Sequence, residues 1–104
     1  MDINEYQSKI RDYVDYPLEV GPYSTILSLT KNLGVLSSKL NNVLIKDHGN
    51  FDKRNALNTI ITLGDILFDI SNMASDLGYS MSDVISLNLM KYNKEKKEES
   101  QNKM

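Results

Sequence analysis

The chain has 104 residues, of which 40% are hydrophobic, and this length accommodates one domain with a modest core. Its 12 basic and 14 acidic residues give a formal net charge of -2, so overall charge favours neither a nucleic-acid polymer nor an anionic membrane as partner. The absence of cysteine excludes disulfides, thiolate metal sites and cysteine nucleophiles. We find no signal-peptide pattern and no stretch of ~20 apolar residues, and we expect a soluble cytoplasmic protein.

The first helix is expected from Asp2 to Val14. Asp2 and Glu5 have the spacing of a capping box, and apolar or aromatic residues recur at helical intervals. The stretch "DYPLEVGPYS" then contains both prolines and a glycine. It indicates an extended connection within one domain rather than continued helix.

Two longer helices are expected next, separated by the loop "KDHGNFD". The second runs from about Tyr23 to Lys46 and the third from about Asp52 to Leu77, with Asp52 as the cap of the third and with His48 and Gly49 in the turn. Each helix carries an apolar seam: Ile26, Leu29, Leu33, Leu36, Leu40 and Val43 on the second, and Ala56, Ile60, Leu63, Leu67, Ile70, Ala74 and Leu77 on the third. These seams favour packing against other helices in a homodimer or homotetramer.

A fourth helix is expected after the break at Gly78, where Ser80 and Asp83 have capping-box spacing. The polar, charged residues 93–104 predict either a solvated helical extension or a frayed tail. No strand pattern is present. The sequence therefore predicts an all-α bundle of about four helices, in a single domain over residues 1–92.

Polar side chains form one line along the third helix: Asn58, Thr62, Asp65, Asp69, Asn72 and Asp76. Such a line is typical of a solvated helix face. The alternative is a divalent cation site, because Asp65 and Asp69 lie one turn apart and Mg²⁺ prefers carboxylate oxygens. The second helix has no acidic residue to complete such a site. His48, the single histidine, is expected to serve in the turn rather than in catalysis.

The order of these segments resembles the MazG-like family of all-α nucleotide pyrophosphohydrolases over nearly the whole chain. The most specific part of the resemblance comprises "TLGDIL" at residues 62–67, "LGYS" at residues 77–80, and Asn88, Leu89 and Lys91 on the fourth helix. The resemblance implies an all-α enzyme that hydrolyses nucleoside triphosphates to a monophosphate and pyrophosphate. It further implies that acidic pairs on two neighbouring helices hold Mg²⁺. It also implies that Asn88 and Lys91 lie near the substrate phosphates.

The family's four metal-binding positions, carried onto this sequence, fall on Asn32, Val35, Thr62 and Asp65. Only Asp65 is acidic, and Asp69 is the nearby residue that could compensate in part. The neutral oxygens of Asn32 and Thr62 leave most of the charge of a divalent ion unbalanced, and valine cannot ligate. Val35 is expected to fill the vacated space as ordinary core.

The sequence therefore favours a MazG-like protein whose Mg²⁺-dependent hydrolysis is weak or lost. Two alternatives stay open. One is an active nucleoside triphosphate pyrophosphohydrolase with a rearranged metal site. The other is a non-enzymatic module that sequesters a nucleotide or binds a protein partner through its helical surface.

Overall fold

The computed structural model describes residues 1–102, which are helical with short connections and contain no strand. The elements in chain order are α1 (Ile3–Ile10), the short 3-10 turns η1 (Arg11–Tyr13) and η2 (Leu18–Val20), α2 (Gly21–Lys46), α3 (Lys53–Asp76) and α4 (Met81–Asn102). The prediction of an all-α fold with four helices is confirmed. No helix in this part of the chain combines the length and the apolar character that a membrane span requires.

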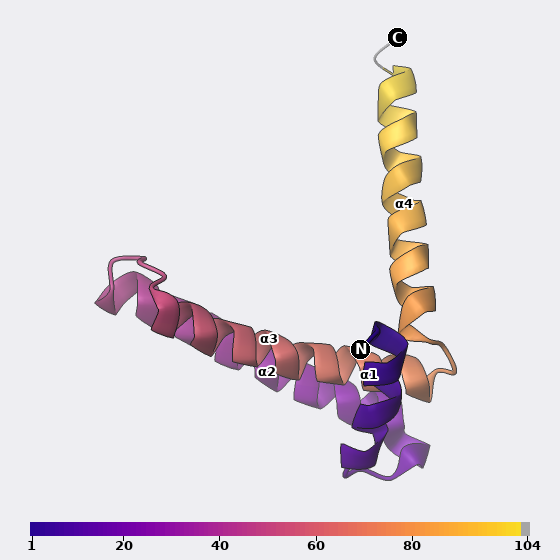
Figure 1. Cartoon of the computed structure of the whole chain (residues 1–104), viewed down its shortest axis with the longest axis horizontal. Coiled ribbons are helices and arrows are strands. Elements are labelled where there is room, and N and C mark those ends of the chain that lie inside the picture. Colours follow the sequence, from indigo (N-terminus) through magenta and orange to yellow (C-terminus); the bar gives the residue numbers. More distant parts are fainter. Residues whose placement is uncertain (103–104) are drawn as a thin grey trace.

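The two long helices α2 and α3 lie side by side as an antiparallel hairpin (Figure 1). Their connection uses a left-handed backbone, with φ of 54° at His48 and 79° at Gly49. Asp52 caps α3, because its Oδ1 accepts a hydrogen bond of 2.8 Å from the Asn55 backbone N–H. The expected cap and the expected turn role of His48 are thus confirmed.

The N-terminal segment is less regular than its sequence pattern predicts. The first helix ends at Ile10 instead of Val14, and its last turn tightens into η1. The proline-containing connection is only partly extended, because it includes η2 and α2 already begins at Gly21. Pro22 lies in the first turn of α2, where a proline leaves no additional N–H unsatisfied.

Gln7 joins α1 to the junction between α3 and α4. Its Nε2 donates to Ser75 Oγ and to the Tyr79 carbonyl oxygen, both at 2.9 Å. Its Oε1 accepts a hydrogen bond of 2.8 Å from the Met81 backbone N–H, which begins α4. A buried amide therefore fixes the position at which the chain turns out of the hairpin.

A second polar cluster fixes the start of α2 against the end of α3. The Asp76 carboxylate accepts a hydrogen bond from Arg11 Nη2 and another from the Tyr16 hydroxyl, each at 2.8 Å. The Thr25 hydroxyl donates to Tyr16 Oη at 3.2 Å and so extends the cluster into α2. Gly21 lies directly against this carboxylate, since an added Cβ would overlap the Asp76 side chain.

The fourth helix leads away from the hairpin (Figure 1). It is continuous to Asn102, so the helical extension is the observed form of residues 93–102, while residues 103–104 lie outside the described part. Every residue from 82 to 102 is exposed in the single chain. This extension contributes little to the core formed by the other elements.

The core of the single chain is small and largely polar. In residues 1–102 the buried apolar residues are Ile10, Val43, Ala74 and Met81. Most other members of the two apolar seams are exposed or half-buried in the single chain, with Leu33 at 50% and Leu63 at 44% of their full accessibility. The apolar surface that ordinarily drives folding is therefore mostly uncovered within one chain.

Candidate functional site

A row of polar side chains lies between α2 and α3, at the level where the resemblance places a metal site. Thr62 and Asp69 on α3 are only 1% and 4% exposed. Asn72, in the same line, is 1% exposed. The polar line on the third helix is therefore not a solvated face at these three positions, and that prediction is wrong there. Burial of Thr62 and Asp69 is tolerated because α2 presents hydrogen-bond partners along the same contact. Asn72 Oδ1 accepts a hydrogen bond from Arg11, whereas its Nδ2 has no partner in residues 1–102.

Asp69 is held from α2 by two neutral donors. Its Oδ2 accepts a hydrogen bond of 2.8 Å from Asn32 Nδ2 and another of 3.0 Å from the Ser28 hydroxyl. Asn32 thus lies next to an aspartate, as a metal-binding position would, but it donates to this carboxylate. One of the two carboxylate oxygens of Asp69 is thus engaged by protein donors.

Thr62 is paired with a cation of the chain itself. Lys39 Nζ donates to Thr62 Oγ1 at 2.6 Å and to the Asn58 carbonyl oxygen at 3.0 Å. An ammonium group next to Thr62 repels a second cation, whichever oxygen Thr62 could offer. No role for Lys39 was predicted from the sequence. Lys39 follows Asn32 by seven residues, a spacing that places both residues on the same face of the helix.

Asp65 and Asp69 occupy different environments although they are one turn apart. Asp65 is exposed, whereas Asp69 is buried against α2. Both carboxylates act on Tyr6 of α1, whose pKa is raised by burial first and then by the negative charges of Asp65 and Asp69. Tyr6 is therefore a group of α1 whose titration these two acids influence.

Val35 is 37% exposed and does not fill the space between the helices. The expectation that it packs as core is wrong for the single chain, because the polar row of α2 takes the positions that face α3. Asn88 and Lys91 are exposed on α4, which leads away from the hairpin, so one chain does not bring them to Asp65 and Asp69 (Figure 1). Lys91 Nζ instead lies 5.6 Å from the centroid of the neighbouring Tyr92 ring.

The donor set of this row fits a divalent cation poorly. Within residues 1–102 no group of three or more histidine, cysteine or acidic side chains could hold a metal ion. Mg²⁺ requires near-octahedral oxygen ligands, and in proteins one or two carboxylates usually hold it together with waters and substrate phosphates. Here the Asp65 carboxylate is exposed, and the Asp69 carboxylate already accepts two hydrogen bonds. Lys39 also places a positive charge next to Thr62.

No protein-family model matches the chain, and no curated protein or solved structure matches it either. The chemistry of the site is therefore inferred from its own geometry.

Proposed function

We propose that this chain is a MazG-like helical protein in which Mg²⁺-dependent hydrolysis of nucleoside triphosphates is weak or lost. The observation that carries the proposal is the filling of the row between α2 and α3 by internal hydrogen bonds. Asp69 is held by Asn32 and Ser28, and Thr62 is held by Lys39. A row that satisfies its own polar groups does not need an ion to balance them.

The replacements also make sense as a stable alternative to a metal site. Several carboxylates between two helices repel one another unless an ion neutralises them. An amide, two hydroxyls and one ammonium group avoid that repulsion and still satisfy the buried polar atoms. A chain under no selection for hydrolysis would keep this arrangement.

The same proposal includes pairing with a second copy of the chain. The apolar seams of α2 and α3 are uncovered, and burying a leucine side chain contributes about 1.5–3 kcal/mol. A two-fold pair of hairpins would cover both seams with the same surface on each subunit. We therefore propose a homodimer or homotetramer that works in the cytoplasm. The ligand that the family resemblance suggests is a nucleotide.

The decisive experiment combines hydrolysis with metal binding. Pyrophosphate release is measured from canonical and modified nucleoside triphosphates in Mg²⁺, and Mg²⁺ alone is titrated by calorimetry. We expect no release above the buffer rate and no saturable heat. Robust release that is abolished by Asp65→Ala would overturn the proposal and make Asp65 a metal ligand.

A second candidate is an active enzyme with a rearranged site. The observation in its favour is that Asp65 and Asp69 act together on Tyr6, so both carboxylates lie near one point of α1. In that case Asp65→Ala and Asp69→Asn would each reduce both the metal heat and the hydrolysis. A non-enzymatic nucleotide-binding module is separated from both by thermal-shift measurements with nucleotides in EDTA, because ligand binding to the folded state raises its apparent stability.

A further inference from the structure

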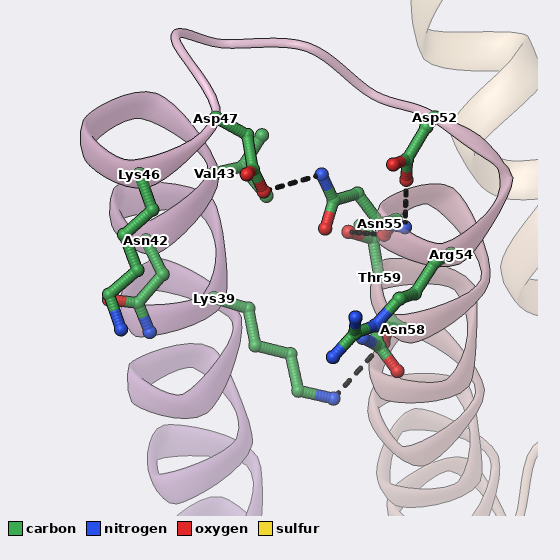
Figure 2. Close-up of a pocket in the computed structure, with 10 residues that line it drawn as sticks. All are labelled: Lys39, Asn42, Val43, Lys46, Asp47, Asp52, Arg54, Asn55, Asn58 and Thr59. Carbon is green, nitrogen blue, oxygen red and sulfur yellow. Dashed lines mark hydrogen bonds between the residues drawn. The ribbon is translucent and has the colours of Figure 1, made fainter.

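A pocket of about 390 Å³ lies at the loop end of the hairpin, away from the Asp65–Asp69 pair. It lies between the last turns of α2 and the first turns of α3, and ten residues line it (Figure 2). Its volume falls within the range of about 300–1,000 Å³ that is typical of small-molecule sites. Of its lining residues, only Lys39 and Asn58 also take part in the contacts of the candidate site.

Three cations line this pocket: Lys39 and Lys46 from α2 and Arg54 from α3. None of them forms an ion pair with a carboxylate in residues 1–102. Lys39 extends from α2 toward α3 (Figure 2) and uses two hydrogen bonds there, so its ammonium group retains one donor. The guanidinium of Arg54 donates no hydrogen bond to any of residues 1–102, so its donors are available to a ligand.

The two acids of the pocket are already engaged near the loop. Asp47 Oδ2 accepts a hydrogen bond of 2.9 Å from Asn55 Nδ2, and Asp52 Oδ1 accepts one of 2.8 Å from the Asn55 backbone N–H. Figure 2 shows both acids at the loop end of the pocket and Lys39 at the opposite end. The charge in the pocket is therefore divided, with cations predominating away from the loop.

We propose that this pocket binds a small phosphate-bearing anion. The planar fork of Arg54 matches two phosphate oxygens, and Lys39 adds an ammonium donor to the same cavity. Lys46 also lines the cavity and adds positive charge, but its side chain lies over α2 and does not extend toward α3 (Figure 2). The side-chain amides of Asn42 and Asn58 also line it and can donate to further oxygens. A metal ion is disfavoured because the three cations would repel it.

Free phosphate and the phosphoryl group of a metabolite share this chemistry. Two-dimensional amide NMR spectra of the labelled full chain are recorded while inorganic phosphate, or separately a nucleoside monophosphate, is added. Sodium chloride at matched ionic strength serves as the reference. We expect saturable shifts limited to residues 39–59, and tighter binding of the monophosphate would identify a metabolite rather than free phosphate as the ligand.

Matched variants test whether phosphate binds in this pocket. Arg54→Gln and Lys46→Gln change exposed residues. Arg54→Gln is expected to weaken binding roughly tenfold, because it removes a charge-assisted contact, and Lys46→Gln is expected to weaken it by a smaller factor, because it removes a more distant positive charge. Lys94→Gln removes the same charge from the exposed α4 and should leave the affinity unchanged. Shifts that equal those in chloride, do not saturate, or respond to all three variants alike would overturn the proposal. Failure of the hydrolysis experiment would not affect this result, since phosphate binding is measured without Mg²⁺ or turnover.

Discussion

The Asn32 side-chain amide donates to Asp69 Oδ2 at 2.8 Å, so an amide on α2 and a carboxylate on α3 are paired across the hairpin. The Ser28 hydroxyl adds a second donor to the same oxygen at 3.0 Å. The dipoles of an amide and a hydroxyl on α2 stabilise the carboxylate of Asp69. Loss of the Asp69 side chain should therefore destabilise the fold, whereas loss of the Asp65 side chain should not.

Asp69→Ala should lower the free energy of unfolding by about 1–3 kcal/mol, because the donors of Asn32 and Ser28 lose a buried partner. Asp65→Ala is the matched control on the same helix. Asp65 is exposed, so its removal should change stability by no more than about 0.5 kcal/mol. Urea unfolding followed by circular dichroism measures both, and equal losses in the two variants would contradict the assignment.

Gly21→Ala should destabilise the protein by about 1–3 kcal/mol, since the new methyl group would overlap the Asp76 carboxylate. The overlap would also disturb the contacts of Asp76 with Arg11 and Tyr16. Gly34→Ala is the control, because a Cβ there meets nothing within 4 Å. It should stabilise α2 by about 0.5–1 kcal/mol through helix propensity. Thermal unfolding of the two variants should therefore shift in opposite directions.

The helices were predictable because their signals are local. Asp2 and Asp52 cap α1 and α3 as expected, and the left-handed glycines at 49 and 78 mark the ends of α2 and α3. The early end of α1 was not predictable, because η1 depends on the contacts of Arg11 with Asn72 and Asp76 at the far end of α3. Contacts over such sequence separations leave no local pattern.

The sides on which α2 and α3 contact each other were harder to predict from the sequence. Hydrophobic periodicity assigns the apolar side of a helix to the core. Within one chain α2 instead turns its polar positions toward α3, including Ser28, Asn32 and Lys39. The one-turn spacing of Asp65 and Asp69 likewise does not reveal that only Asp69 is buried. That difference depends on the rotation of α3 about its axis relative to α2.

Tyr6 should make stability depend on pH in the alkaline range. Burial, followed by the charges of Asp65 and Asp69, raises its folded-state pKa above the ordinary value of 10.0. The folded chain then binds this proton more tightly than the unfolded chain, so the contribution to stability is complete below pH 10.0 and is lost as pH rises through the folded-state pKa. Thermal unfolding of wild type and Tyr6→Phe over this range should show a steeper alkaline loss in wild type.

Tyr23→Phe provides the control for that comparison, because Tyr23 is an exposed tyrosine on α2. It should retain the alkaline profile of the wild type. Asp65→Asn should reduce the difference between wild type and Tyr6→Phe, since it removes one of the two charges that act on the phenol. A difference that is unchanged in Asp65→Asn would exclude the Asp65 charge as a cause and leave burial and the Asp69 charge.

Leu33→Arg should dissociate the proposed pair of hairpins. Leu33 is exposed on the uncovered seam of α2, and in a two-fold assembly a single substitution places the charge in the interface twice. Each lost leucine contact costs about 1.5–3 kcal/mol, so the loss is enough to shift association at micromolar concentration. Sedimentation should show a lower mass for Leu33→Arg than for wild type.

Ser38→Arg separates an effect on the seam from a general effect of added charge. Ser38 is exposed on the same helix but lies outside the line of apolar residues, so this variant should sediment with the mass of the wild type. Circular dichroism of both variants reports whether the helices persist. A wild-type chain that sediments as a folded monomer would contradict the pairing, since the seams would then be stable in water without a partner.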